Sequence, residues 1–183
     1  MLQELVVVLA LVLANGFFSG AEMAIVASRR GRLRQMADAG DSAAAAALDL
    51  ASSPDRFLPT VQVGITLVGT LAAAYGGDRL VGQLAGWIAA HAPPALATAA
   101  QPIALTLFVA LFSFVTLLLG ELVPKRLALR QAEAFARRVA PIMQLFARLT
   151  TPLVWGLAAA TRAVMFLCGA RGQEGPTVSV DDI

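Results

Sequence analysis

Three long apolar stretches dominate the pattern of hydrophobic and polar positions along this chain. They cover residues 2–28, 58–90 and 103–119. A helix needs about 20 consecutive apolar residues to cross the hydrocarbon core of a bilayer. Because the charged residues gather between these stretches, the pattern predicts three transmembrane helices.

A fourth apolar stretch, residues 142–167, differs because it is interrupted by arginines and prolines. Arg137, Arg148 and Arg162 fall near one stripe of a 3.6-residue helix. Arginine is costly inside a bilayer, whereas a helix with an arginine stripe is typical of the membrane surface. We therefore expect an amphipathic juxtamembrane helix. The alternative, a fourth span, would place the C-terminal tail outside the cell.

Composition and charge support an inner-membrane protein with a defined orientation. Hydrophobic residues make up 58% of the chain and charged residues 14%, which excludes an ordinary soluble domain. Basic residues accumulate on the cytoplasmic side of membrane proteins. This rule predicts an external N-terminus and a cytoplasmic C-terminus, and it leaves no reason to expect a nucleic-acid partner. The deciding residues are Arg29, Arg30, Arg32, Arg34 and Arg56 after the first span, and Lys125, Arg126, Arg130, Arg137 and Arg138 after the third.

Short connecting helices are expected on the cytoplasmic side. The first span is expected to continue into its basic flank without a break. A turn at Gly40 and Asp41 precedes an Ala/Leu helix over residues 42–52, and residues 53–55 break that helix. Pro59 is expected in the first turn of the second span, where proline is well tolerated.

The first span carries a strip of polar side chains. Asn15, Ser19 and Glu22 lie within about 60° of one another on a helix. Gly16 and Gly20 form a GxxxG pair that lets another helix approach closely. A carboxylate in a span indicates a functional site, and the strip suggests cation binding. The alternative is a packing interface with locally satisfied polar groups.

The third span ends in a second acidic motif. Pro124 has no amide hydrogen, so the carbonyl of Gly120 loses its helical donor and needs another partner, for which a cation is one candidate. Glu121 adds negative charge beside it. The alternative is a Glu121–Lys125 ion pair that caps a kinked helix. Lys125 is the single lysine beside thirteen arginines, which suggests that a compact ammonium group is needed there.

The second span contributes Gly64, Thr66 and Gly69, either for tight helix packing or for coordination by backbone carbonyls. Oxygen ligands of all these kinds suit hard cations such as Mg2+. One histidine and one cysteine argue against a zinc or copper site. With no nucleophile and base side by side, we do not expect an enzyme.

The motifs in residues 15–24, 55–68 and 120–125 together resemble the transmembrane domain of the CorC/CNNM (cyclin M) magnesium transporters. The resemblance implies an all-α homodimer with three spans per protomer and an inner belt of juxtamembrane helices. It implies export of Mg2+ coupled to Na+ influx, with regulatory CBS domains in the cytosol. Those domains would follow Ile183, so no nucleotide site is expected within this chain.

The resemblance also implies a division of the chain and a cation pocket. Residues 1–140 would form the three-span domain with its connecting helices, residues 141–170 the juxtamembrane helix, and residues 171–183 a linker to the CBS domains. The implied pocket residues are Ser19, Gly120, Glu121, Gly64, Thr66 and Gly69, supported by Asn15 and Glu22, with structural or gating roles for Gly16, Gly20, Pro124 and Lys125.

Two departures from the family pattern affect the pocket. Members often have a second serine where this chain has Ala21, and an asparagine where it has Gly69. The ligand set can therefore differ from that of the family. The alternative function is a membrane anchor that senses a divalent cation for a cytosolic domain without transporting it.

Overall fold

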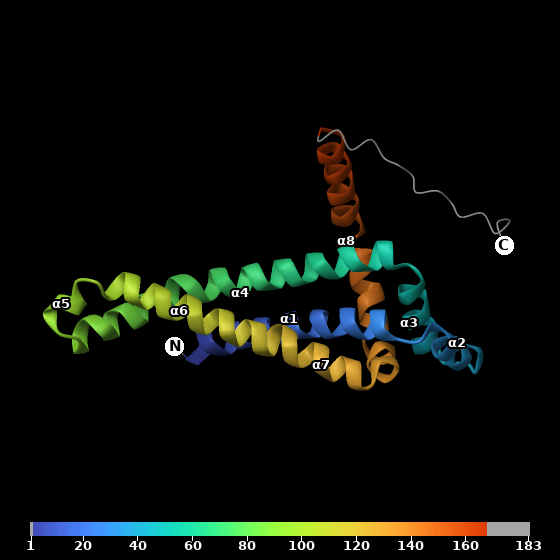
Figure 1. Cartoon of the computed structure of the whole chain (residues 1–183), viewed down its shortest axis with the longest axis horizontal. Helices are drawn as coiled ribbons and strands as arrows, with labels where there is room; N and C mark the ends of the chain where they lie inside the picture. The colour runs from blue at the N-terminus through green and yellow to red at the C-terminus, as the bar shows by residue number, and fades with distance from the viewer. Residues whose placement is uncertain (1, 168–183) are drawn as a thin grey trace, which may run out of the picture.

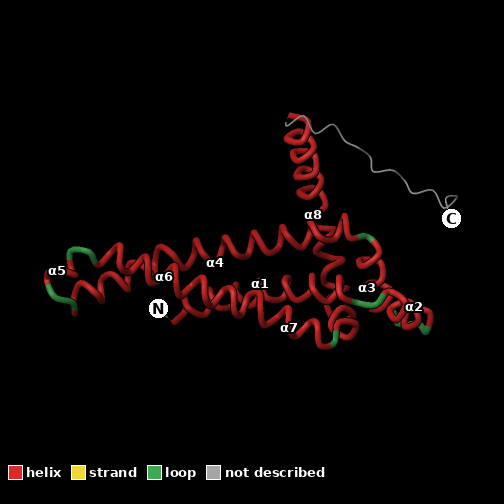
Figure 2. The backbone as a smooth tube through the Cα atoms, in the orientation of Figure 1, coloured by secondary structure: helices red, strands yellow, loops and turns green. Residues whose placement is uncertain are grey.

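The computed structural model describes the backbone of residues 2–167, and all side chains within it except those of Leu2, Asp78 and Ala95. The described residues form helices joined by short loops, without a strand (Figure 2), so the all-α prediction is confirmed. The elements are α1 (Leu2–Ala27), α2 (Arg30–Asp38), α3 (Ser42–Ser52), α4 (Pro54–His91), α5 (Pro94–Ala97), α6 (Ala100–Leu117), the π-helical segment η1 (Leu118–Leu122), α7 (Val123–Arg130) and α8 (Ala132–Leu167).

The helices α1, α4 and α6 run along a common direction (Figure 1). α1 packs against α4, η1 and α7, and α4 and α6 form a hairpin closed by α5. α8 instead crosses the direction of this bundle at the end where α2 and α3 lie. Within residues 2–167, four helical stretches are long and apolar enough to cross a membrane: Gln3–Ala27, Pro54–His91, Ala100–Arg130 and Ala132–Leu167.

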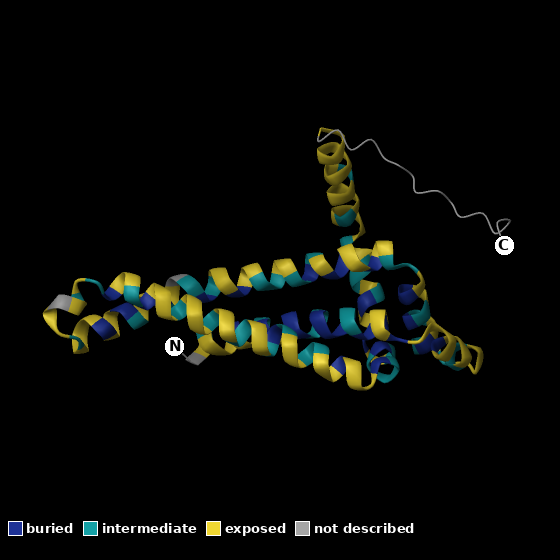
Figure 3. Ribbon diagram, in the orientation of Figure 1, coloured by how far each residue is buried: buried dark blue, intermediate teal, exposed yellow. Residues whose placement is uncertain are grey.

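In the part of the chain that the structure describes, two clusters of buried apolar residues hold the helices together (Figure 3). The larger cluster lies where α8 and α3 meet the bundle and includes Ile25, Phe57 and Met143. The smaller one joins α4 to α6 near the opposite end and includes Val81 and Ala104. The outer faces of the long helices are apolar yet exposed, as expected for surfaces that contact lipid.

The prediction that the first span continues unbroken into its basic flank was wrong. α1 ends at Ala27, and Arg29 is extended, with a ψ of 107°. The hydroxyl of Ser28 donates a hydrogen bond to the carbonyl of Ala24, at 2.5 Å. The turn brings Leu33 of α2 into the larger apolar cluster, where it is fully buried. Burial of this side chain explains the break, because a straight helix would carry Leu33 away from the core.

The expected turn and short helix that follow are confirmed. Gly40 adopts a φ of 95°, which glycine tolerates best. Asp41 then caps α3, its carboxylate accepting hydrogen bonds from the amides of Ala43 and Ala44, both at 3.0 Å. α3 spans residues 42–52 as predicted.

The start of the second long helix differs from the prediction. α4 begins at Pro54, so Pro59 lies inside the helix rather than in its first turn. Pro54 already has the fixed φ that suits the first helical position. Phe57, one turn later, is buried in the core and fixes this early start.

The segment expected to form the juxtamembrane helix, residues 141–170, lies within a longer helix as far as the structure describes it. This helix, α8, begins at Ala132 and continues through Pro141 and Pro152; its position relative to the membrane stays a prediction. The ion pair between Arg137 and Asp41 joins α8 to the cap of α3. The predicted linker, residues 171–183, lies outside the described residues.

Candidate functional site

A π-helical segment interrupts the third long helix where the sequence predicted a missing hydrogen bond. The amide of Val123 donates to the carbonyl of Leu118, five residues earlier. The Gly120 carbonyl, which Pro124 cannot serve, accepts a hydrogen bond from Nδ2 of Asn15 at 3.1 Å. The partner that the sequence required is therefore an amide from α1. Single π-helical turns are frequent at functional sites.

Two glycines of α1 allow this close approach. A Cβ atom on Gly16 would lie 2.7 Å from the carbonyl oxygen of Leu119 and 2.9 Å from Cγ of Pro124. A Cβ on Gly20 would lie 3.2 Å from the ring of Phe135. Gly16 in particular has no room for a side chain, so the backbones of α1 and η1 are in direct contact.

Three buried oxygen atoms near this contact have no hydrogen-bond partner among the described residues: Asn15 Oδ1, Ser19 Oγ and Thr116 Oγ1. A Cβ on Gly120 would lie 3.2 Å from Asn15 Nδ2 and 3.5 Å from Cγ2 of Thr116. A Cβ on Gly69 would lie 3.9 Å from Asn15 Oδ1. Side chains from α1 and α6 and the backbones of α4 and η1 therefore converge at Asn15. Buried polar atoms are normally paired, so three exceptions close together need an explanation.

The two predicted carboxylates meet at the lone lysine. Nζ of Lys125 lies 2.9 Å from Oε1 of Glu121 and 3.8 Å from Oε2 of Glu22. The predicted Glu121–Lys125 ion pair is thus present. Glu22, which has no basic neighbour on its own helix, finds its partner on α7. The side chains of Glu22 and Lys125 are 29% and 27% exposed, and that of Glu121 is 47% exposed.

The three residues of the second long helix that were predicted as site residues lie in different surroundings. Gly69 lies beside Asn15. Gly64 lies under the ring of Phe18, with a Cβ position 2.8 Å from that ring, and Thr66 is exposed. Gly64 therefore provides packing space for Phe18. The ligand roles expected for Gly64, Thr66 and Gly69 stay predictions.

Thr116, a polar residue near the end of the third span, was not among the pocket residues chosen from the sequence. It lies one turn before Gly120 on the same helix, and this spacing to the carbonyl freed by Pro124 is the signal that could have found it. Its hydroxyl is buried next to the α1–η1 contact. The site therefore includes a residue of α6.

The donor set suits a hard cation. Residues 2–167 contain no group of three or more His, Cys, Asp or Glu side chains placed to hold a metal ion. What the structure brings together instead is amide and hydroxyl oxygens, with the carboxylates of Glu22 on α1 and Glu121 on η1 close by. Mg2+ and Ca2+ bind oxygen ligands of these kinds.

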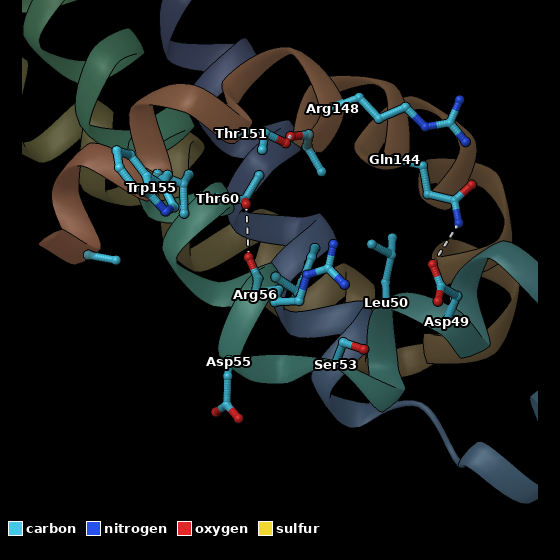
Figure 4. A pocket seen from close by; sticks show the side chains of 14 residues that line it. Asp49, Leu50, Ser53, Asp55, Arg56, Thr60, Gln144, Arg148, Thr151 and Trp155 are labelled. Atoms are coloured by element: carbon cyan, nitrogen blue, oxygen red, sulfur yellow. Dashed lines mark hydrogen bonds between the residues drawn. The ribbon is translucent and has the colours of Figure 1, made fainter.

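A separate cavity of about 410 Å3 lies between α3, the start of α4 and α8 (Figure 4). Thr60 in its wall donates a hydrogen bond to the carbonyl of Arg56 at 2.8 Å, and Gln144 donates to Asp49 at 3.1 Å. None of the predicted site residues lines this cavity. It is therefore distinct from the polar group at Asn15.

Comparison with known proteins identifies the family. The model of the cyclin M transmembrane N-terminal domain matches residues 6–183 of this chain. The chain belongs to the CNNM family. The resemblance of residues 15–24, 55–68 and 120–125 to this family is thereby confirmed.

Curated relatives of this CNNM domain include an inner membrane protein and a polyamine export protein. A UPF0053 protein of Synechocystis is 43% identical over 98% of this chain and 40% of its own length. The UPF0053 inner membrane protein YfjD of Escherichia coli is 32% identical over 86% of the chain and 33% of its own length. The polyamine export protein of Escherichia coli is 34% identical over 85% of the chain and 34% of its own length. The chain thus spans less than half the length of these relatives.

Proposed function

We propose that this CNNM domain is the membrane part of a cation exporter that moves Mg2+ out of the cell, coupled to the influx of Na+. The observation that carries the proposal is the set of three buried oxygen atoms at the contact of α1 with α6 and η1 that have no hydrogen-bond partner in the described part of the chain. Buried polar atoms are costly unless something binds them. An oxygen-binding cation that is taken up and released accounts for all three at once.

The transport path follows the polar strip of α1. Asn15 and Ser19 offer neutral oxygens, and Glu22 lies one turn farther along the helix, beside Glu121. This carboxylate end of the strip faces the basic loops. With the basic loops in the cytosol, Mg2+ reaches the carboxylates first and the neutral oxygens afterwards. Because Mg2+ holds its water strongly, several oxygens at short range are needed to replace it.

The proposed topology has three transmembrane spans and a juxtamembrane α8, with the N-terminus outside the cell and the C-terminus in the cytosol. Two observations support this topology. The start of α4 and the helices α2 and α7, which carry most of the basic residues outside α8, lie toward the same end of the bundle, and α8 crosses the bundle direction (Figure 1). The most apolar part of α8 has no buried residue, which leaves it available for the membrane surface or for a second protomer of a homodimer.

Export of polyamines is a second candidate function. Two relatives, from Escherichia coli and Haemophilus influenzae, are named polyamine export proteins. Glu22 and Glu121 together hold the primary ammonium group of Lys125, and the ends of a polyamine have the same chemistry. This binding of an ammonium group by two carboxylates favours a polyamine or another amine as an additional substrate class.

Transport by the reconstituted chain tests these functions. Proteoliposomes with an internal Mg2+ indicator would be compared for the unchanged chain, Glu121→Gln and the control Asp38→Asn, an exposed carboxylate on α2. Mg2+ flux that reverses with the Na+ gradient, survives in Asp38→Asn and disappears in Glu121→Gln supports coupled export. Mg2+ binding without flux supports the sensing anchor. Flux of labelled spermidine without flux of Mg2+ supports amine export.

A further inference from the structure

The ammonium group of Lys125 occupies the most negative position of the polar strip. It lies between two carboxylates that come from different elements, Glu22 of α1 and Glu121 of η1. Lys125 is the only lysine of the chain, which otherwise has thirteen arginines and one histidine. A compact ammonium on a flexible four-carbon stem can leave a carboxylate pair more readily than a guanidinium, which binds carboxylates through two parallel hydrogen bonds.

This arrangement differs from an ordinary surface ion pair. Exposed pairs contribute little to stability, and here two negative charges share one positive charge, which leaves a net charge of −1. The carboxylates also continue a strip whose next two members, Ser19 and Asn15, are 1% and 7% exposed and have oxygen atoms without partners in residues 2–167. The site therefore combines an excess of negative charge with ligand atoms that no other described group uses.

We propose that Lys125 is a tethered cation that competes with the transported ion for Glu22 and Glu121. The proposal rests on the proposed transport of Mg2+ through this site. When the site is empty, the ammonium neutralises part of the carboxylate charge and keeps Glu22 and Glu121 together. When Mg2+ arrives, its two charges match the two carboxylates, and the ammonium moves away toward the cytosolic water that it already touches.

The charge of the bound ion determines whether the ammonium group of Lys125 stays between the two carboxylates. The carboxylate pair reaches neutrality with Mg2+ and the ammonium displaced, or with Na+ and the ammonium retained. Like charges confined to one site repel one another, so Mg2+ together with a retained ammonium is disfavoured. Lys125 therefore makes Mg2+ release easier, and it gives the site one stable arrangement for each of the two exchanged ions.

Binding measurements on the complete chain in lipid nanodiscs test the role of Lys125. Titration calorimetry would give the Kd for Mg2+ of the unchanged chain, Lys125→Met, Lys125→Arg and Arg126→Met. Arg126 is the adjacent, exposed basic residue, so its variant controls for the general loss of a positive charge. Lys125→Met is expected to lower the Kd for Mg2+ roughly tenfold or more. A tenfold change corresponds to about 1.4 kcal/mol of binding free energy. Lys125→Arg is expected to raise the Kd, and Arg126→Met to leave it unchanged.

Each result decides between the two proposals. Tight Mg2+ binding by Lys125→Met without any flux in the unchanged chain retains the tethered cation and overturns transport. Mg2+ flux in the unchanged chain, with a Kd in Lys125→Met that is equal or higher, overturns the tethered cation and retains transport. No Mg2+ binding by any variant overturns both. If Lys125→Met does not fold, Lys125→Arg decides, because a Kd that is unchanged or lower in that variant overturns the proposal.

Discussion

The side-chain amide of Asn15 donates a hydrogen bond to the carbonyl of Gly120 across 3.1 Å, and this carbonyl has lost its own helical donor to Pro124. The bond joins the first long helix to the π-helical segment of the third. The other polar atom of the same side chain, Asn15 Oδ1, is buried without a partner in the described part of the chain. Asn15 thus supplies the hydrogen bond that the Gly120 carbonyl lacks, and its side-chain oxygen is available to a ligand in the site.

Replacing Asn15 by Leu is expected to destabilise the fold by about 1–3 kcal/mol, because the Gly120 carbonyl is then buried without a donor. Thermal unfolding in detergent measures the loss. The loss is expected to be smaller in a Pro124→Ala background, where residue 124 regains an amide hydrogen that can serve Gly120. Equal losses in both backgrounds would show that the Gly120 carbonyl is not what Asn15 stabilises.

Replacing Gly16 by Ala is expected to separate α1 from η1, because the new methyl group would lie 2.7 Å from a backbone oxygen that cannot move freely. We expect a loss of about 1–3 kcal/mol in stability, as for other overpacked contacts, together with a strong loss of Mg2+ flux. Gly82→Ala in α4 is the matched control, since nothing lies within 4 Å of its Cβ position. It is expected to be neutral or stabilising by up to about 1 kcal/mol. Similar losses in the two variants would argue against the close contact.

Replacing Ser19 by Ala is expected to weaken Mg2+ binding while leaving the unfolding temperature unchanged or raised. The Ser19 hydroxyl is buried and has no partner within residues 2–167, so its removal costs no hydrogen bond. Ser28→Ala is the control, because Ser28 is also buried on this chain segment but bonds the carbonyl of Ala24. Titration calorimetry should show a raised Kd for Mg2+ in Ser19→Ala and an unchanged Kd in Ser28→Ala. An unchanged Kd would remove Ser19 from the ligand set.

The side of the membrane on which α8 ends can be read from the single cysteine, Cys168, which follows that helix in the chain. With three spans, Cys168 is cytosolic and does not react with an impermeant maleimide in intact cells. Ala92→Cys in a Cys168→Ser background places the thiol in the loop between α4 and α5, where labelling is expected. Labelling of Cys168 from outside would establish α8 as a fourth span.

Local composition and covalent chemistry were enough to predict much of this protein. Long apolar stretches predicted the long helices, and the turn at Gly40 and Asp41 and the bounds of α3 followed from backbone preference and capping. The need of the Gly120 carbonyl for a new partner followed from proline having no amide hydrogen. The resemblance to the CNNM family rested on short motifs in the same way.

The tertiary structure decided which groups meet, because the relative rotation and depth of packed helices depend on contacts far apart in the sequence. Only the packing of α1 against η1 selects Asn15 as the partner of Gly120 and brings Lys125 within reach of Glu22. Burial of Leu33 breaks the first helix, and the ring of Phe18 fills the space beside Gly64. The sequence by itself determined the helices and the chemistry that they carry, while the way they pack determined which oxygen atoms share one site.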